Sequence, residues 1–215
     1  MALKLKSQNR KINFISFEGI DGCGKSTQAK LLFDYLIKLK KKVLFIHEPG
    51  STSISEDIRK ILVNKNNNAM SYKTEALLFM AARAQLIHEK ILPALKNNFI
   101  IICDRFIDSS VVYQGIVRNL GVDFIKKLND FATDNIKPDL TFFLDIKPET
   151  AQARKNNLGN LDRFELEDYA FYKKIHDGYK KIFLEPENKN RIIFLDGEKN
   201  LDYIHQKIIS SFELI

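Results

Sequence analysis

Short apolar runs alternate with amphipathic stretches along most of the chain. The apolar runs predict buried strands at residues 12–17, 43–46, 99–103, 140–144 and 191–195. Apolar positions with helical spacing predict helices near residues 27–39, 53–63, 72–95, 107–133, 147–155, 166–185 and 200–212. Such alternation is typical of parallel sheets that helices cover on both faces. We therefore expect an α/β fold whose five-stranded parallel sheet is flanked by helices on both faces.

A glycine-rich segment follows the first predicted strand directly. Residues 17–28 read Phe-Glu-Gly-Ile-Asp-Gly-Cys-Gly-Lys-Ser-Thr-Gln and contain the complete phosphate-binding pattern Gly-x-x-x-x-Gly-Lys-Ser. Backbone N–H groups of such a loop cradle phosphate oxygens, Lys25 reaches the β- and γ-phosphates, and the Ser26 hydroxyl can bind Mg²⁺. The preceding strand and the following helix, whose N-terminus favours anions, argue against a chance match. The residues predicted to bind a nucleoside triphosphate are Gly19, Ile20, Asp21, Gly22, Cys23, Gly24, Lys25, Ser26 and Thr27.

Polar residues also follow the second and third predicted strands. Glu48-Pro49-Gly50 follows the second strand, and Asp104-Arg105-Phe106 follows the third. Ligands of parallel α/β sheets bind beyond the carboxyl ends of the strands. Asp104 is therefore placed to hold Mg²⁺, directly or through water, and the Arg105 guanidinium matches a phosphate bidentately. The alternative is that the Asp104–Arg105 pair forms an ordinary ion pair on the surface.

The predicted helix at 72–95 carries two candidate faces. One face would be apolar and packed, and it comprises Leu77, Met80, Ala81, Ala84, Ile87 and Ile91. Phe79 and Arg83 lie four positions apart on another face, so they are neighbours. An aromatic ring beside a guanidinium suits a nucleobase, because the ring stacks and the arginine donates to a carbonyl. A second packing contact next to a solvated arginine explains the same pattern equally well.

A basic segment between two predicted helices is a candidate lid, near residues 154–166. Residues 153–165 read Ala-Arg-Lys-Asn-Asn-Leu-Gly-Asn-Leu-Asp-Arg-Phe-Glu, so cations flank a polar, glycine-bearing loop. Arg154, Lys155 and Arg163 could reach a phosphoryl group in transfer, and closure would keep water away from the triphosphate. A solvated basic loop is the alternative.

Composition limits the other classes of protein. The 215 residues suggest a single domain over 11–215, after a flexible extension at 1–10 that lacks the apolar stretch of a secretory signal. The formal charge is +7, but residues beyond 42 are charge-balanced, so we expect no nucleic-acid partner. No apolar run approaches 18 residues, so we expect no membrane span.

The two cysteines, Cys23 and Cys103, show no metal-ligand spacing. The thiol of Cys23 lies at a helix N-terminus, which could lower its pKa. The favoured interpretation is that Cys23 is a small residue that fills a tight loop.

These motifs, in this order and spacing, resemble the thymidylate kinase family from about Ile12 to Ser211. The matching segments are Phe17-Glu-Gly-Ile-Asp-Gly-Cys-Gly-Lys-Ser-Thr, Glu48-Pro-Gly, Leu78-Phe-Met-Ala-Ala-Arg83, Asp104-Arg-Phe, Tyr113-Gln-Gly, Lys137-Pro-Asp-Leu140, Leu144-Asp145 and Leu161-Asp-Arg-Phe-Glu165. The resemblance implies a three-layer P-loop kinase sandwich with a short lid. It also implies a cytoplasmic homodimer that uses ATP and Mg²⁺ to phosphorylate dTMP.

The resemblance assigns roles to single positions. Phe79 would stack on thymine, Arg83 would bind its O4, and Arg105 would grip the dTMP phosphate. Further positions would line the acceptor pocket: Asp21 at the 3′-hydroxyl, Glu48, Pro49 and Gly50, Ser110 and Gln114 near the base, and Tyr113 against C2′. The predicted catalytic residues are Lys25, Asp104, Arg105 and Arg154.

The chain departs from the family pattern at the catalytic arginine. Family members carry it either in the phosphate loop, where this chain has Gly22, or in the lid. Leu158 occupies the lid position where an arginine is common, so Arg154 is our first candidate.

The nearest alternative to a thymidylate kinase is another nucleoside monophosphate kinase. A regulatory GTPase would need the guanine-reading Asn-Lys-x-Asp, and Asn64-Lys-Asn-Asn67 lacks the aspartate.

Overall fold

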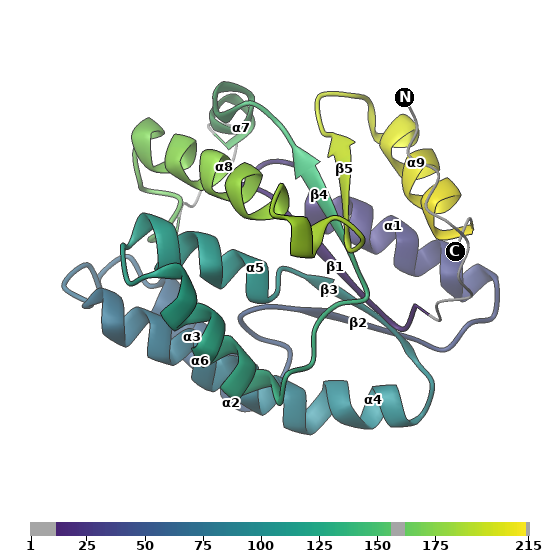
Figure 1. Cartoon of the computed structure of the whole chain (residues 1–215), viewed down its shortest axis with the longest axis horizontal. Coiled ribbons are helices and arrows are strands. Elements are labelled where there is room, and N and C mark those ends of the chain that lie inside the picture. The colour runs from purple at the N-terminus through teal and green to yellow at the C-terminus, as the bar shows by residue number, and fades with distance from the viewer. Residues whose placement is uncertain (1–11, 156–161, 214–215) are drawn as a thin grey trace.

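The computed structural model describes residues 12–155 and 162–213 (Figure 1). Its centre is a parallel five-stranded sheet with the order β2-β3-β1-β4-β5. The strands are β1 (Phe14–Glu18), β2 (Val43–His47), β3 (Ile100–Asp104), β4 (Leu140–Asp145) and β5 (Ile192–Asp196). Every predicted strand is confirmed to within two residues, because strands buried on both faces are continuous apolar runs.

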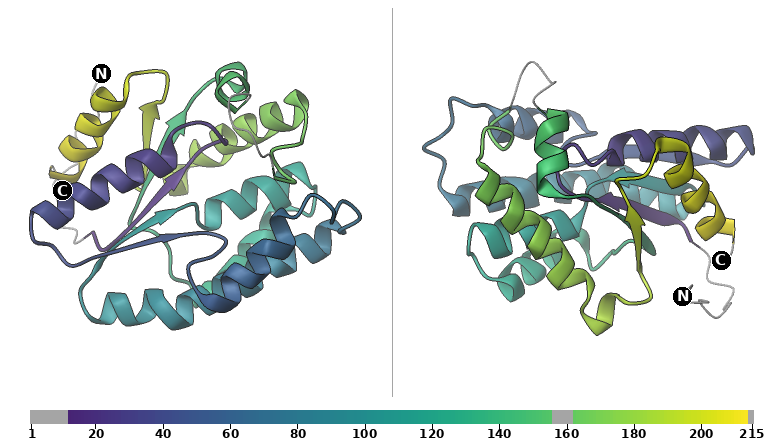
Figure 2. Two further views of the ribbon diagram at one scale, coloured as in Figure 1. Left: turned by 180° about the vertical axis from the view of Figure 1, so that it is seen from behind. Right: turned by 90° about the horizontal axis from the view of Figure 1, so that it is seen from above.

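Helices cover both faces of the sheet, as predicted. The helices are α1 (Lys25–Lys38), α2 (Ser53–Val63), α3 (Tyr72–Leu86), α4 (Leu92–Lys96), α5 (Ile107–Ser110), α6 (Val122–Thr133), α7 (Pro148–Lys155), α8 (Tyr169–Phe183) and α9 (Leu201–Glu213). Two π-helical segments, η1 (Ile87–Ile91) and η2 (Val111–Val117), and a 3₁₀ turn, η3 (Pro186–Asn188), complete the described elements. Helices α1 and α9 pack together beside the sheet, whereas α8 and the α3–α6 group lie on its other side (Figure 2).

Two predicted helices differ from the structure. The segment predicted as one helix over 107–133 is interrupted after Val117, and α6 begins only after Gly121. Asn119 and Gly121 have positive φ angles of 56° and 94°, which end a helix. The helix predicted over 72–95 widens into the π-turn η1 just before Pro93, whose ring disrupts regular α-helical hydrogen bonding.

The predicted apolar face of α3 is wrong in part. Met80, Ile87 and Ile91 are buried, but Leu77 is 59% exposed, and Ala81 and Ala84 are also exposed. The helix instead buries Glu75, Ala76, Met80, Ala82, Arg83 and Leu86. The spacing of apolar residues did not reveal this face because two of its buried residues are charged.

Candidate active site

The glycine-rich loop joins β1 to α1 and is packed too tightly for side chains at two of its glycines. A Cβ atom at Gly19 (φ 148°) would lie 2.9 Å from the Leu144 carbonyl oxygen, and one at Gly22 (φ 82°) would lie 3.0 Å from the Ala151 carbonyl oxygen. The N-cap residue of α1 is Gly24, which has no side chain to cap the helix, and a helix N-terminus favours an anion. The loop therefore has the backbone of a phosphate site.

Cys23 fills space inside this loop. It is 1% exposed, and its Sγ would lie 2.7 Å from a Cβ at Gly19. Burial raises the pKa of the Cys23 thiol, with Lys25 and Arg105 only partly opposing it. The possibility that the helix N-terminus lowers this pKa is therefore wrong, and the packing interpretation holds.

Asp21 joins two of the predicted cations. Its Oδ1 lies 2.6 Å from Nη2 of Arg105 and 3.2 Å from Nζ of Lys25. Burial alone would raise the pKa of Asp21, but Arg105 and Lys25 outweigh this effect and lower it. Asp21 therefore remains ionised and brings the lysine of the loop next to the arginine that follows β3.

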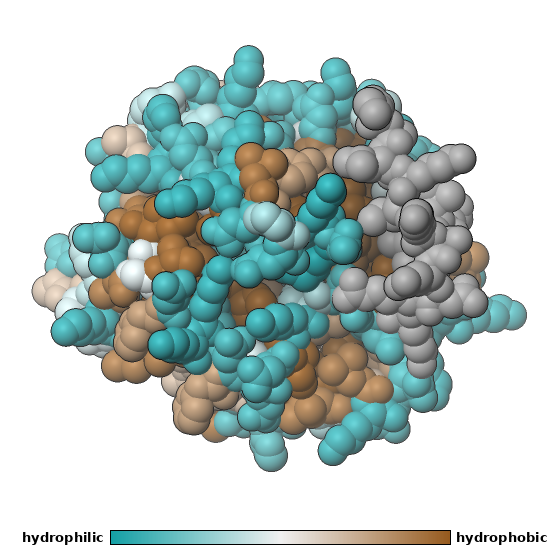
Figure 3. Space-filling model, viewed as in Figure 1, coloured by the Kyte–Doolittle hydropathy of each residue, from teal (hydrophilic) through white to brown (hydrophobic). Residues whose placement is uncertain are grey.

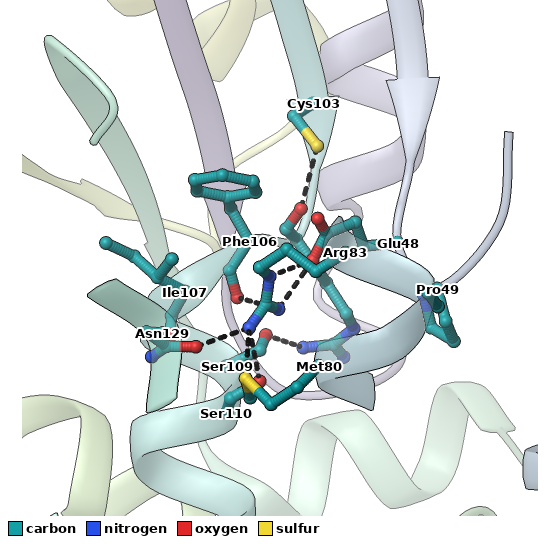
Figure 4. A network of polar contacts seen from close by, with 12 residues as sticks. Glu48, Pro49, Met80, Arg83, Cys103, Phe106, Ile107, Ser109, Ser110 and Asn129 are labelled. Carbon is teal, nitrogen blue, oxygen red and sulfur yellow. Dashed lines mark hydrogen bonds and ion pairs between the residues drawn. The ribbon is translucent and has the colours of Figure 1, made fainter. Parts of the chain in front are cut away.

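The residues predicted to contact the acceptor, with the exception of Gly50, line one cavity beside the glycine-rich loop. The cavity is lined by Asp21, Glu48, Pro49, Arg59, Val63, Phe79, Arg83, Arg105, Phe106, Ser109, Ser110, Tyr113, Gln114, Asp162 and Phe164. Its residues come from segments that are far apart in the chain, as Figure 4 shows for the part around Arg83. The structure thus brings the predicted set together, while the role of each member remains a prediction.

Arg83 is enclosed at one end of this cavity and is only 2% exposed. Its Nε and Nη2 both donate to Oε2 of Glu48, at 2.8 and 2.5 Å (Figure 4). Its Nη1 donates to Ser110 Oγ (3.0 Å) and Asn129 Oδ1 (2.5 Å), and Nη2 also donates to the Phe106 carbonyl (3.2 Å). The solvated-arginine alternative is therefore wrong. Because all five N–H groups are used, binding a thymine O4 would require Arg83 to share a donor, such as the one on Ser110.

Aromatic rings also line this cavity. The ring of Phe164 lies 6.0 Å from that of Phe79 and 6.2 Å from that of Tyr113. The Arg105 guanidinium lies 5.3 Å from the centre of the Tyr113 ring. The predicted contact Gln114 lines the cavity, but its Nε2 donates to Glu75 at 2.9 Å. A lining of aromatic rings and a few polar groups suits a flat, largely apolar ligand with one polar edge.

The two arginines of the predicted lid, Arg154 and Arg163, lie in different places. Arg154 extends from α7 to the glycine-rich loop, where its Nη1 donates to the Gly22 carbonyl at 3.2 Å and its Nη2 to the Gly197 carbonyl at 3.3 Å. Arg163 instead bonds Glu75 at 2.8 Å and the Leu62 carbonyl at 2.8 Å. The Arg163 guanidinium thus ties the chain to α2 and α3, and its predicted reach to a phosphoryl group stays a prediction.

Other parts of the predicted lid lie outside the described residues. These are the Lys155 side chain and residues 156–161, which include Leu158. The predicted N-terminal extension at 1–10 also lies outside them.

The two predicted Mg²⁺ ligands are oxygen donors at the edge of the loop. Ser26 is exposed in the first turn of α1. Asp104 ends β3, and its Oδ1 is buried without a hydrogen-bond partner among the described residues. A hydroxyl and an unsatisfied carboxylate oxygen suit a hard cation such as Mg²⁺, which takes its remaining ligands from phosphates and water. Within 12–155 and 162–213 no group of three His, Cys, Asp or Glu residues offers a complete metal site.

Sequence reasoning missed several residues around this site. Arg59 of α2 lines the cavity and donates to the Pro49 carbonyl at 2.9 Å. Glu18, Ser109 and Tyr179 surround Arg105, and they come from three separate segments. Glu18 did carry a signal, since an acid at the end of an apolar strand is unusual. Tyr179 lies in an ordinary amphipathic helix and gave none.

Comparisons with known proteins agree with this geometry. A family model described as thymidylate kinase matches residues 17–208. A protein named thymidylate kinase from Thermoanaerobacter sp. (strain X514) is 48% identical over 199 residues, which cover 93% of this chain and 96% of the relative. One of the same name from Thermosipho africanus (strain TCF52B) is 47% identical over 200 residues, with 93% and 97% covered. Among the described residues, no helix is long and apolar enough to cross a membrane. The chain therefore belongs to the thymidylate kinase family.

Proposed function

We propose that this protein transfers the γ-phosphate of ATP to dTMP, a step of dTTP biosynthesis, in the cytoplasm where these nucleotides occur. The observation that carries the proposal is the single cavity in which Phe79, Arg83 and Arg105 lie beside the glycine-rich loop. The cavity offers an aromatic wall and a polar end for a base, and it offers a guanidinium for a phosphate. Relatives named thymidylate kinase support the same assignment.

An ADP-release assay with a panel of acceptors tests this function. Purified protein with ATP and Mg²⁺ should phosphorylate dTMP with a higher kcat/KM than dUMP, dCMP, dGMP or dAMP. Preference for another member of the panel would identify a different nucleoside monophosphate kinase. No turnover of any member would refute the proposed function.

The chemistry needs little proton transfer. The second pKa of a phosphate monoester is about 6, so the acceptor is largely dianionic at neutral pH. The obstacle is repulsion between two polyanions, which amounts to about 4 kcal/mol per charge pair at 4 Å and an effective dielectric constant near 20. Lys25, Arg105 and Arg154 offset this repulsion and hold the donor and acceptor in line. Mg²⁺, held by Ser26 and Asp104, would neutralise charge on the triphosphate.

We expect Arg154→Ala to lower kcat by about 10²–10³, the usual loss for one donor to a transition-state charge, with the KM for both nucleotides nearly unchanged. The reason is that Arg154 does not line the acceptor cavity and contacts the loop only through the Gly22 carbonyl, so we expect it to act on the charge that develops during transfer rather than on binding of either nucleotide. Steady-state kinetics measure both parameters, and Arg154→Lys is the matched variant that keeps the charge. An unchanged kcat in Arg154→Ala would show that another cation stabilises the charge during transfer.

We also propose that the protein is a homodimer joined through α2, α3 and α6. The support is an apolar surface on these adjacent helices, where Ile54, Ile61, Leu77, Phe124 and Phe131 are 54%, 47%, 59%, 54% and 85% exposed. Brown residues gather in the lower left of Figure 3, where Figure 1 draws these helices. Sedimentation equilibrium should give twice the chain mass for the native protein and a monomer for Phe131→Glu.

A further inference from the structure

Glu18 is the last residue of β1, directly before the glycine-rich loop, and its side chain is 0% exposed. Its Oε1 accepts from the backbone N–H groups of Phe106 (2.8 Å) and Ser109 (3.4 Å). Its Oε2 accepts from Ser109 Oγ (2.6 Å) and the Tyr179 hydroxyl (2.8 Å). Within the described part of the chain it pairs with no lysine or arginine directly. Burying a carboxylate without a paired cation costs folding free energy, so a functional role would explain why Glu18 is there.

The two hydroxyl groups that bind Glu18 are also the acceptors for Arg105. The Arg105 Nη1 donates to Ser109 Oγ at 3.0 Å and to the Tyr179 hydroxyl at 3.1 Å. An ionised carboxylate can only accept hydrogen bonds. When both hydroxyls bond the ionised Glu18, both of their protons point toward it, and the 2.8 Å contact between Ser109 Oγ and the Tyr179 hydroxyl is then not a hydrogen bond. This arrangement leaves their lone pairs directed at Arg105. The charge of Glu18 thus decides the direction of the whole chain of hydrogen bonds.

Glu18 also holds the backbone next to Arg105. Arg105 has a positive φ of 67°, which is unfavourable for a residue with a Cβ atom. The Arg105 N–H donates to the Phe17 carbonyl at 3.0 Å, and the next N–H, that of Phe106, donates to Glu18. Hydrogen bonds from the end of β1 therefore secure both sides of this strained residue.

The remaining donors of Arg105 are left for a ligand. One Nη2 hydrogen binds Asp21, and Nη1 is fully used by Ser109 and Tyr179. Among the described residues, Nε and the second Nη2 hydrogen have no hydrogen-bond partner, and Arg105 lines the acceptor cavity. Nε and Nη2 share one edge of the guanidinium, and such an edge can pair with a phosphate in a fork.

We propose that Glu18 is a positioning residue for the acceptor phosphate, which acts through Ser109 and Tyr179 to hold Arg105 in its phosphate-binding orientation. The proposal rests on the proposed function, because it assumes that Arg105 binds the phosphate of dTMP. Burial and the nearby Asp108 raise the pKa of Glu18 to about 7, while Arg105 opposes this rise. Glu18 is therefore mainly ionised, and able only to accept, above that pH.

The Glu18→Gln variant keeps the shape of the side chain and reverses one bond. The amide NH₂ group donates, so Ser109 or Tyr179 must turn a lone pair toward it, and its proton then points toward Arg105 or toward the other hydroxyl. Either change disturbs the set of acceptors that holds Arg105. At pH 8 we expect the KM for dTMP to rise about tenfold or more, which corresponds to losing one charge-assisted hydrogen bond. The KM for ATP should change by less than about twofold, because no bond to the triphosphate loop is lost. Ser16→Ala is the matched control, since Ser16 is buried on the same strand and bonds Thr141 outside the cavity.

A double-mutant cycle separates this role from general support of the fold. If Glu18 acts through the two hydroxyls, Glu18→Gln should have little further effect on the KM for dTMP in a Ser109→Ala/Tyr179→Phe protein. Additive effects, or equal increases in the KM for ATP and dTMP, would overturn the proposal. If Glu18→Gln does not fold, Ser109→Ala and Tyr179→Phe alone should each raise the KM for dTMP selectively, and an unchanged KM in both would overturn it. A wild-type protein that does not phosphorylate dTMP would refute the proposed function. If the wild type is active and Glu18→Gln has an unchanged KM for dTMP, only this inference is refuted.

Discussion

Arg105→Ala is expected to lower kcat/KM for dTMP by about 10³ or more and to leave ATP binding within about twofold. Arg105 lines the acceptor cavity, and its unpaired edge offers the fork that a phosphate dianion needs. In its proposed role it would anchor dTMP in the ground state and offset the repulsion between the two nucleotides during transfer. Steady-state kinetics with each substrate varied in turn measure the two effects separately.

A graded variant strengthens this test. Arg105→Lys keeps the positive charge but loses the planar fork, so it should recover only part of the activity. Lys126→Ala provides a control, because Lys126 bonds Glu185 and Glu187 away from the cavity. Equal losses for ATP and dTMP in Arg105→Ala would contradict the assigned role.

Arg83→Met should lower both stability and acceptor binding. It removes one partner of a buried ion pair and leaves Glu48, whose side chain is 4% exposed, without its cation. Breaking a buried pair in this way costs about 3–5 kcal/mol. In a chain of this length that corresponds to a fall in Tm of roughly 6–20 °C. Thermal unfolding monitored by circular dichroism measures the change.

The double variant Arg83→Met/Glu48→Gln distinguishes the two consequences. Burial raises the pKa of Glu48, and Arg83 opposes this rise, so the carboxylate depends on the arginine to be ionised. Removing both charges should restore most of the lost Tm, because no uncompensated charge remains. Binding of dTMP should not recover, since the polar end of the cavity is lost. Recovery of dTMP binding together with Tm would show that Arg83 serves only the fold.

The predicted lid illustrates how two residues of the same type come to bind different parts of the protein. Arg154 and Arg163 flank the same loop in the sequence, and both were candidates for the phosphoryl group. Arg154 lies at the end of α7, whose backbone packs against Gly22, so its side chain reaches the glycine-rich loop. Arg163 lies beside α2 and α3, where the buried carboxylate of Glu75 binds it. The helices that lie beside each arginine therefore decide which groups its guanidinium binds.

The sequence by itself determined the strand positions and the phosphate loop. These are local properties: a buried parallel strand is a continuous apolar run, and the loop depends on glycines within eight consecutive residues. The family motifs also named the residues that line the acceptor cavity, because each motif follows a strand or lies on one helix.

Only the tertiary structure decided which of these residues are buried and what they bind. The rotation of α3 buried Arg83 against Glu48, and no periodicity could predict this, because an arginine is buried only where a partner meets it. The bonds that hold Arg105 join Glu18 to Ser109 and to Tyr179, which lies 161 residues further along the chain. Such contacts arise when separate elements pack, so local sequence carries no trace of them. In this protein the sequence determined which groups are available, and packing decided their protonation, direction and partners.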